Sequence, residues 1–433
     1  MSLKQYLHAS PWICAPMVHQ SELTFRLLCR RYNVSLAATP MLHSRIFAST
    51  PEYRAIEYQT HPLDQPLIAQ LCASEPHDVV NAAQHLGGAN LIDLNFGCPQ
   101  QIAKRGNYGA FLLTDVPKMQ SLVNALVETA PHIPVSCKIR LLPSKQATLN
   151  VATALIEAGA QMLTVHGRTR EQNKQQSGAA NWKAVRSVVA AVREQSGTDV
   201  VVVSNGGVGS LHEAQASLDY TGADGVMAAE GLLCNPAMFY EIDKDDDTAV
   251  QEFVDLVKLR PVVAEATVDR ATASTELLLY THLIHMRQLA LAQEYLALAK
   301  LHSNQYMKPV RSHVFKLCHA VLTDHTDVRV VFGKAKTLEH MEQGIAVLVA
   351  RTEEGCAAFS SGGSGGSVGV DVIRESIEWA RDQSEREKQE VHEVTAKFYV
   401  AAAAGLALHC NDVVGQTAAT LDQKLWYTRH PRM

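Results

Sequence analysis

Eight short apolar runs recur between residues 12 and 230, and longer stretches with helical character separate them. Continuous apolar runs of this length are typical of strands that are buried on both faces of a parallel sheet. Eight strand–helix units predict a (β/α)8 TIM barrel, an α/β fold, whereas the alternative of a doubly wound open sheet accounts less well for eight units. The runs are WICAPM (12–17), VSLAATP (34–40), LIAQLC (67–72), LIDLNFG (91–97), PVSCKIR (134–140), MLTVHGR (162–168), VVVVSNG (200–206) and GVMAAE (225–230). Apolar residues at helical spacing occur between them at 21–32, 77–86, 150–160 and 181–195.

Polar residues gather at the ends of six of these eight runs, and Pro16 and Met17 end a seventh. In a barrel the carboxyl ends of the strands converge on one face, and that face holds the active site. Ordinary loop solvation is the alternative explanation, and it fits a repeated pattern less well. The residues are Pro16, Met17, Gln70, Asn95, Lys138, Arg140, His166, Arg168, Asn205 and Glu230.

The pattern changes after residue 240, where long Leu- and Ala-rich segments predict a helical bundle appended to the barrel. An acidic connector (241–247) precedes helical segments at 250–266, 274–304, 309–325 and 335–351, and SSGGSGGSVG (360–369) is typical of a flexible linker. A charged helix is predicted within 370–404. We therefore predict a barrel domain (1–240), a helical domain (241–352), a Gly/Ser-rich linker (353–369) and a helical tail of unassigned role (370–433).

Charge and cysteine usage narrow the functional classes. The net charge of −5 and the isoelectric point near 6.4 mean that any nucleic-acid site must be a local patch. The nine cysteines are scattered without the paired spacing of zinc sites, which favours a reducing compartment and no metal. No run reaches the roughly 20 apolar residues of a membrane helix. We expect a cytoplasmic monomer without membrane contact, and a nuclear or organellar location stays open.

A local basic patch does occur between residues 300 and 336, where seven Lys and Arg residues stand against two Asp residues. Lys308 and Arg311 are its candidates for contact with RNA phosphates, and a solvated helix face is the alternative. Lys104 and Arg105, on a glycine-containing loop, form a second candidate pair. The seven residues are Lys300, Lys308, Arg311, Lys316, Arg329, Lys334 and Lys336.

Two motifs place cations at strand ends. Lys138 and Arg140 in KIR point to the same side of their strand, where a cation needs an anionic partner such as a reduced flavin or a barrel glutamate. His166 and Arg168 in HGR can hydrogen-bond a ring oxygen or a phosphate, although a lone strand-end histidine is more often structural.

Two further motifs indicate a phosphate site and a reactive thiol. The glycines of VSNGGV (203–208) and MAAEG (227–231) let backbone amides approach a phosphate closely, with a simple turn as the alternative. In LNFGCPQQIAKRG (94–106), Cys98 stands between a glycine and a proline directly after an apolar run. Most buried cysteines are inert, whereas a thiol at a strand end can be directed at a substrate.

The motifs APM, LNFGCP, KRGNYGAFLL, KIR, HGRTREQ, SNGGV and MAAEGLLCNPAMF follow one another within residues 10–350. Together they resemble the tRNA-dihydrouridine synthase family, and the AEG and NPA elements resemble its eukaryotic branch, which acts on D-loop uridines 16 and 17. The resemblance implies an oxidoreductase that uses FMN, takes NADPH or NADH as a transient reductant, and modifies tRNA. It implies that the barrel (1–240) is an FMN-binding catalytic domain and that the helical domain (241–352) binds tRNA.

The resemblance also assigns site residues. It implies that FMN is held by Pro16, Met17, Val18, Gln70, Lys138, His166, Asn205, Gly206, Gly207, Ala229 and Glu230. It implies that Asn95, Arg140 and Arg168 lie near the target base. Many members of the family carry Gly-Arg where this chain has Ala229 and Glu230, so an arginine contact to the phosphate is absent here.

The implied reaction gives Cys98 a defined task. Reduced FMN transfers hydride to C6 of a flipped-out uridine, and the resulting enolate needs a proton at C5 from a positioned acid. A thiol with an ordinary pKa of about 8.5 is mostly protonated at pH 7, so Cys98 is predicted to act as an acid rather than a nucleophile.

Two other functions stay open. A flavin-dependent dehydrogenase of free pyrimidines shares a similar cysteine loop, but it has no need of the basic segment at 300–336. A tRNA-binding protein without catalytic activity could keep the barrel as a scaffold, but the presence of Cys98, Lys138 and His166 argues against it.

Overall fold

The computed structural model describes residues 3–8, 10–173, 176–240, 273–302 and 306–360. Contacts divide the chain into two compact units, one joining Met1–Glu241 to Glu294–Lys316 and the other joining Ile242–Gln293 to Leu317–Met433. The unit that holds the barrel therefore also contains residues 294–316 of the predicted helical domain. The predicted domains, in contrast, meet at residue 240. The predicted connector at 241–247 and the predicted helices at 250–266 and 370–404 lie outside the described residues.

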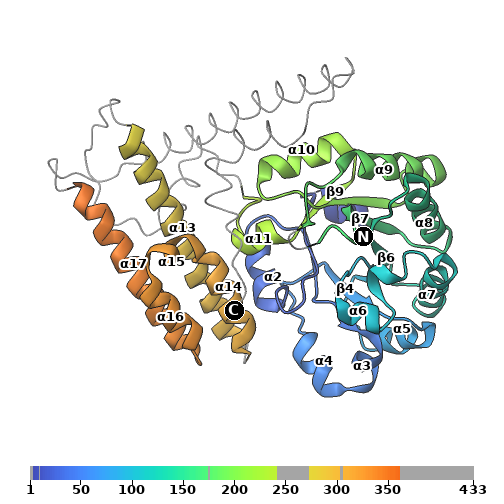
Figure 1. The fold of residues 1–433 in the computed structure, drawn as a ribbon. Coiled ribbons are helices and arrows are strands. Elements are labelled where there is room, and N and C mark those ends of the chain that lie inside the picture. The colour runs from blue at the N-terminus through green and yellow to red at the C-terminus, as the bar shows by residue number, and fades with distance from the viewer. Residues whose placement is uncertain (1–2, 9, 174–175, 241–272, 303–305, 361–433) are drawn as a thin grey trace, which may run out of the picture. The chain divides into compact units, whose positions relative to one another are not determined.

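Eight parallel strands close into a barrel, which confirms the predicted fold class (Figure 1). Strand β1 closes the barrel by pairing with β2 on one side and β9 on the other, and β2 pairs with β4. Each strand coincides with one of the eight predicted runs. They are β1 (Trp12–Cys14), β2 (Leu36–Ala38), β4 (Leu67–Cys72), β5 (Leu91–Phe96), β6 (Val135–Leu141), β7 (Met162–Thr169), β8 (Val201–Asn205) and β9 (Gly225–Ala228).

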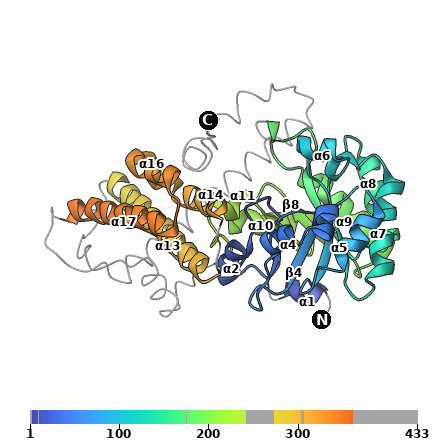
Figure 2. The same ribbon diagram turned by 90° about the horizontal axis from the view of Figure 1, so that it is seen from below.

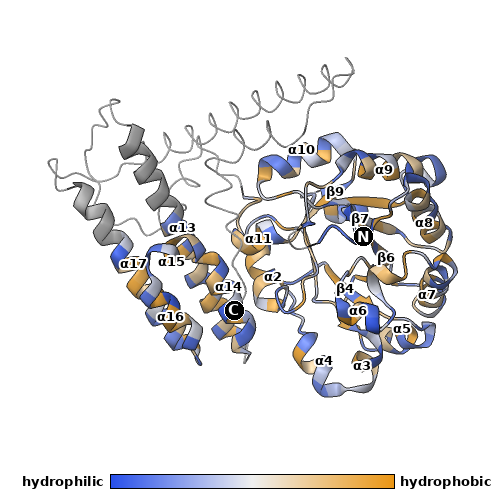
Figure 3. Ribbon diagram, viewed as in Figure 1, coloured by the Kyte–Doolittle hydropathy of each residue, from blue (hydrophilic) through white to orange (hydrophobic). Residues whose placement is uncertain are grey.

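Helices cover the outside of the strands and bury apolar residues against them, and Figure 3 shows apolar and polar residues interspersed along these helices. Those at 21–32, 77–86, 150–160 and 181–195 were predicted. Side-chain caps at Ser144, Asn181 and Ser210 accept an N–H from the first turns of α8, α9 and α10, which sets where these helices begin. The helices are α2 (Leu23–Arg31), α5 (Pro76–Ala83), α7 (Val116–Thr129), α8 (Lys145–Glu157), α9 (Trp182–Ser196) and α10 (Leu211–Thr221).

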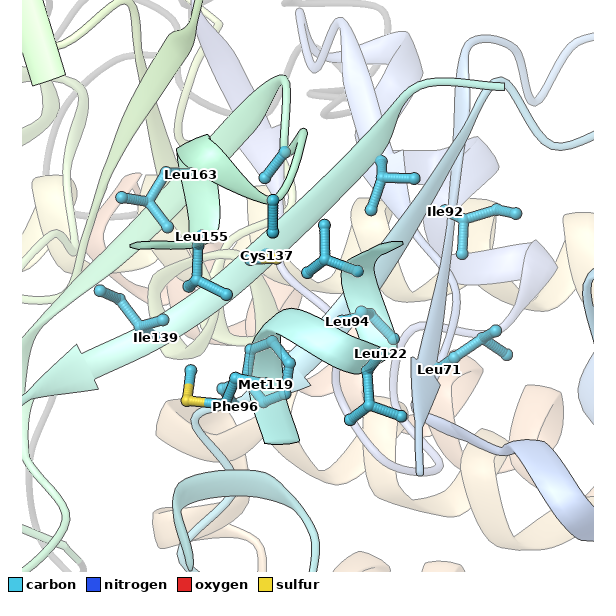
Figure 4. Packing of buried hydrophobic residues seen from close by; sticks show 14 of the residues in the cluster. Leu71, Ile92, Leu94, Phe96, Met119, Leu122, Cys137, Ile139, Leu155 and Leu163 are labelled. Carbon is cyan, nitrogen blue, oxygen red and sulfur yellow. The ribbon is translucent and has the colours of Figure 1, made fainter. Parts of the chain in front are cut away.

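Strand residues alternate between two cores. Leu94, Phe96 and Ile139 point outward and pack with Met119 and Leu122 of α7 (Figure 4). The opposite faces of the strands fill the barrel interior with a smaller cluster, which comprises Ile13, Leu36, Ile68, Leu91, Met162, Val201, Val203 and Met227. Because successive residues of a strand face opposite ways, Asp93 and Asn95 point into the barrel.

Short elements surround the carboxyl ends of the strands. Strand β3 (Leu42–His43) extends the sheet beside β4, and α3 (Ser44–Ser49) and α4 (Pro51–Glu57) follow it. The loop after β5 carries α6 (Gln101–Arg105) and the short 3-10 helix η1 (Gly109–Phe111), and α11 (Glu230–Cys234) follows β9. Figure 2 shows α6 and α1 (Leu3–His8) at opposite ends of the barrel.

The helices after the barrel differ in detail from those predicted. The segment 309–325 divides at Cys318 into α14 (Met307–Leu317) and α15 (His319–Asp324), and α16 (Thr326–Lys334) was not predicted. Helix α13 (Ala273–Leu301) was predicted, and α17 (Leu338–Ser360) continues through 353–360, which had been assigned to the linker. Two Glu and two Ala residues in that stretch favour helix and outweigh its single glycine, Gly355. Among the described residues, no helix is both long and apolar enough to cross a membrane.

Candidate active site

Polar side chains line the barrel interior at the carboxyl ends of the strands, above the apolar interior cluster. Strand register places them in adjacent positions: Asn95 pairs with Lys138, and His166 pairs with Asn205. Side chains two residues apart on one strand share a face, so Ser136 and Lys138 both point inward. The ring consists of Gln70, Asp93, Asn95, Ser136, Lys138, Thr164, His166 and Asn205.

A hydrogen-bond network fixes one side of this ring. The buried Asp93 carboxylate accepts from the Gln70 amide at 2.8 Å and from the Ser136 hydroxyl. Gln70 Oε1 in turn accepts from Asn95 Nδ2 at 2.8 Å. Burial raises the pKa of Asp93, while the hydrogen bonds from Gln70 and Ser136 oppose that rise. Both ends of the Gln70 amide are therefore occupied inside the protein, and the network orients Asn95.

Asn95 holds the loop that carries Cys98. Its Oδ1 accepts the backbone N–H of Gly97 at 3.0 Å and that of Cys98 at 2.8 Å. On the other side, the N–H of Ala110 donates to the carbonyl of Cys98 at 3.0 Å. Gly109 has φ +67°, and a Cβ at this position would lie 2.8 Å from the Cys98 carbonyl oxygen. The loop is therefore held closely on both sides of the thiol.

The Cys98 thiol is partly buried and packs against a small cluster formed by Cys72, Ala103 and Tyr108. Burial raises the pKa of Cys98, and the charges of Arg140 and Lys138 oppose that rise only in part. The thiol is consequently protonated at neutral pH, which is the state that a proton donor requires.

Lys138 is a partly buried cation at the centre of the ring. Burial, followed by the positive charge of Arg140, lowers its pKa from 10.5 to about 8. Among the described residues no hydrogen bond or ion pair engages its ammonium group, and the carboxylate of Asp93 is already bonded to Gln70 and Ser136. A cation in this setting is unfavourable until an anion lies beside it.

The neighbouring cations have partners in the protein. Arg140 donates through Nε to the carbonyl of Gly97 at 2.7 Å and through Nη1 to that of Thr169 at 2.9 Å. Arg168 donates to the carbonyl of Gly178 and lies 3.3 Å from His166 Nε2. Burial lowers the pKa of His166 well below its usual value, and nearby cations add to the effect, so the imidazole is neutral. The site is thus strongly electropositive.

The loop after β8 is shaped by two glycines with positive φ. Gly206 has φ +100°, and a Cβ there would lie 2.7 Å from His166 Cδ2, so only glycine fits. Gly207 has φ +74°, and Trp182 Nε1 donates to the carbonyl of Gly206 at 3.0 Å. Asn205 does not point to solvent, because its Nδ2 donates to the carbonyl of Met227 on β9 at 2.8 Å.

The loop after β9 lies against the loop after β8. A Cβ on Gly231 would meet Val208 O and Gly209 Cα at 2.9 Å, which shows how closely the two loops approach. Ala229 is partly buried, whereas Glu230 is exposed and accepts from Lys316 Nζ of α14 at 2.7 Å.

The remaining predicted residues lie at the edges of the site or on helix surfaces. Pro16 and Met17 are partly buried after β1, and Val18 is exposed. Lys104 and Arg105 are exposed on α6, in the loop that also carries Cys98. On α14, Lys308 is exposed and Arg311 is partly buried.

Five residues that shape the site were not predicted. They are Asp93, Ser136, Thr164, Gly109 and Trp182. For Asp93, Ser136 and Thr164 the sequence does hold a signal, because each lies two positions before a predicted site residue and so shares its face of the strand. For Gly109 and Trp182 it holds none, because their contacts come from other loops.

Comparisons with known proteins agree with this architecture. The model of the dihydrouridine synthase (Dus) family matches residues 13–348. A tRNA-dihydrouridine(16/17) synthase-like protein of Rattus norvegicus is 36% identical over 353 residues, which cover 81% of this chain and 69% of that protein. The tRNA-dihydrouridine(16/17) synthase of Schizosaccharomyces pombe is 34% identical over 76% of this chain and 74% of its own length. The corresponding Saccharomyces cerevisiae enzyme is 41% identical over 52% of this chain, and the match spans 53% of that enzyme.

Solved structures are more distant. A crystal structure of mandelate oxidase aligns with a TM-score of 0.36 and 14% identity over 57% of this chain and 70% of that one, a likeness too weak to bear on function. The family match, by contrast, runs from the first barrel strand through α14 and into α17 and includes every predicted catalytic motif. The chain therefore belongs to the dihydrouridine synthase family.

Proposed function

We propose that this chain is an FMN-dependent tRNA-dihydrouridine synthase that reduces uridines 16 and 17 of the D-loop at the expense of NADPH or NADH. One observation carries the proposal. Lys138 on β6 is a cation in a ring of polar groups with no hydrogen bond or ion pair to its ammonium group among the described residues, and the protonated Cys98 thiol lies in the loop after the neighbouring strand β5. The names of the relatives support the choice of substrate, since those with broad coverage are tRNA-dihydrouridine(16/17) synthases.

The residues present fit a flavin mononucleotide. Lys138 lacks an anionic partner, and the buried Thr164 hydroxyl has no hydrogen-bond partner among the described residues. Only glycine fits at position 206, so the backbone of this loop lies directly against His166 and Arg168 with no side chain between them. Lys138 and His166 would hold the ring, and Asn205, Gly206, Gly207 and Ala229 would surround the ribityl chain and the phosphate. Bound FMN supplies the two electrons that reduce the uracil C5=C6 bond.

The protein's own contribution to that reduction is the proton. Cys98 keeps its proton at neutral pH and delivers it to C5 of the uracil, while Asn95 holds the loop in place through two backbone N–H groups. Arg140 fixes the same loop from the side of β6 through the Gly97 carbonyl.

The substrate must reach a barrel interior, so the target uridine leaves the D-loop stack at a cost of a few kcal/mol, which is smallest for an unpaired loop base. Exposed Lys104 and Arg105 beside Cys98 contact the flanking phosphates. Lys308 and Arg311 on α14 contribute a second set of phosphate contacts.

Reaction of the purified protein tests this function against its alternatives. The protein is incubated with FMN, NADPH and tRNA transcribed without modifications, and the tRNA is digested and analysed by mass spectrometry. We expect a gain of two mass units at positions 16 and 17. Reduction of free uracil without reduction of tRNA would instead identify a pyrimidine dehydrogenase, and binding of tRNA without flavin or reduction would identify a protein that only binds RNA.

A further inference from the structure

The Glu230–Lys316 ion pair brings a lysine from a distant part of the sequence to the loops where the cofactor phosphate is expected. Lys316 Nζ donates to Glu230 Oε1 at 2.7 Å, and the lysine side chain is 27% exposed. Glu230 follows Ala229 directly, and the next residue, Gly231, lies against Val208 and Gly209. Lys316 therefore reaches the junction of the β8 and β9 loops.

Glu230 by itself is unsuited to this position. A carboxylate next to a phosphate is unfavourable because the two groups carry like charges. The ion pair with Lys316 removes that repulsion. Within the described residues, Lys316 donates only this one hydrogen bond, so two of its three N–H groups remain available to an anion.

Helix α14 holds Lys316 in a fixed position. One turn earlier, His313 is fully buried, lies 3.0 Å from Glu22 through Nε2, and stacks on Phe25 with ring centroids 4.4 Å apart. Ser312 accepts from Gln20 Nε2. Residues 312, 313 and 316 share one face of a helix, so the contacts that anchor α14 also direct Lys316 to Glu230.

We infer that Lys316 is a cofactor-binding residue that supplies the cationic contact to the FMN phosphate, with Glu230 as the residue that positions it. This inference rests on the proposed flavin function and deepens it. The positive charge beside the β9 loop comes from α14, through the ion pair of Lys316 with Glu230. Because α14 also carries Lys308 and Arg311, the same helix serves the cofactor and the proposed RNA contact.

Comparison of FMN with riboflavin, which lacks the phosphate, tests the inference. We measure the dissociation constants of both flavins by fluorescence quenching for the wild-type protein, Lys316→Met and Lys316→Arg. Loss of one charged contact should weaken FMN binding about tenfold or more in Lys316→Met, leave riboflavin binding unchanged, and be largely restored in Lys316→Arg. Equal weakening of both flavins, or no change in either, would overturn the inference.

A matched control is available on α7. Lys118 pairs with Glu75 at 2.8 Å and is 26% exposed, so it resembles Lys316 in geometry and exposure. It belongs to the segment between β5 and β6, on the other side of the barrel from β8 and β9. Lys118→Met should leave the binding of both flavins unchanged. A wild-type protein that binds neither flavin would contradict the proposed function itself, which separates the two failures.

Chemical labelling of the wild-type protein gives a second test that needs no variant. Reductive methylation followed by mass spectrometry reports the rate at which each lysine is modified. FMN should slow the labelling of Lys316 and leave Lys118 unaffected, and riboflavin should protect neither. Labelling of Lys316 at the same rate with and without FMN would contradict the contact.

Discussion

Burial changes the acid–base behaviour of two side chains in the candidate site, the Cys98 thiol and the Lys138 ammonium group. Burial raises the pKa of Cys98, so that the thiol stays protonated. It lowers the pKa of Lys138 to about 8, because the charged form loses solvation when it is buried. Lys138 is still mostly charged at neutral pH, and that charge destabilises the folded protein. The raised pKa of Cys98 suits a proton donor, and the buried charge of Lys138 suits a site that binds an anion.

Replacement of the thiol tests the proton donor. Cys98→Ala should oxidise NADPH and bind FMN like the wild-type protein, because neither step needs the thiol. It should form dihydrouridine at a rate lower by about 100-fold or more, which is the usual contribution of a positioned acid. Stopped-flow absorbance follows the flavin, and mass spectrometry follows the tRNA. A rate equal to that of the wild-type protein would show that another group donates the proton.

Lys138→Met should stabilise the flavin-free protein and weaken FMN binding. Because the pKa of Lys138 is about 8 in the folded protein and near 10.5 in the unfolded chain, the unfolded chain binds more protons between these values. Lys138 therefore lowers the free energy of unfolding below pH 8, and this destabilisation disappears as the pH rises toward 10.5. The shift from 10.5 to about 8 corresponds to at most about 3.4 kcal/mol.

Denaturant unfolding at pH 7 and pH 9.5 measures this effect. The wild-type protein should gain stability from this group over the interval, and Lys138→Met should lack that gain. Identical pH dependence of the two free energies of unfolding would mean that Lys138 is not desolvated in the folded protein.

The strands were predictable because an eight-stranded parallel barrel buries both faces of each strand, which leaves a continuous apolar run with a polar end. The break at Cys318 and the continuation of α17 to Ser360 were not, because they depend on packing and on weak local preferences. In the site, Cys98, Lys138 and His166 were found from motifs at strand ends. The Asp93–Gln70–Asn95 network and the contact of Lys316 with Glu230 arise between segments far apart in the sequence.

The loop after β5 depends on Gly109 in η1, because this residue has a backbone conformation that only glycine adopts readily. Gly109→Ala places a methyl group against the Cys98 carbonyl and strains a residue at φ +67°. We expect the Cys98 loop to shift and dihydrouridine formation to fall about tenfold to a hundredfold, with FMN binding retained.

Gly87→Ala is the matched control for this variant, because its added Cβ meets nothing within 4 Å and its φ is not positive. It should react at the wild-type rate. If Gly109→Ala also reacts at the wild-type rate, the loop tolerates the displacement and Gly109 does not position the thiol.

In the whole molecule, the compact unit of the barrel extends to residues 294–316 of the helical segment. Arg31 and Tyr32 at the end of α2 both bond Glu294 of α13, and Tyr295 donates to Glu22 at 2.8 Å. These contacts join residues 294 and 295 of α13 to the barrel, and His313 of α14 contacts Glu22 in the same way. The proposed RNA-binding residues Lys308 and Arg311 therefore belong to the same compact unit as the site.

Charge reversal on α14 tests the proposed RNA contact. Lys308→Glu combined with Arg311→Glu should weaken tRNA binding and reduce the slope of log affinity against log salt by about one for each lost phosphate contact. Flavin reduction by NADPH should not change. Fluorescence anisotropy at several salt concentrations provides the slope, and an unaltered slope would place the tRNA on another surface.

Position-resolved mass spectrometry of tRNA from cells that lack this protein tests the central claim most directly. The proposed function predicts that positions 16 and 17 of the D-loop carry unmodified uridine, two mass units lighter than in the parent cells, while dihydrouridine at other positions persists. Re-expression of the wild-type chain, but not of Cys98→Ala, should restore the modification. Dihydrouridine at full level at positions 16 and 17 in cells without the protein would contradict the account.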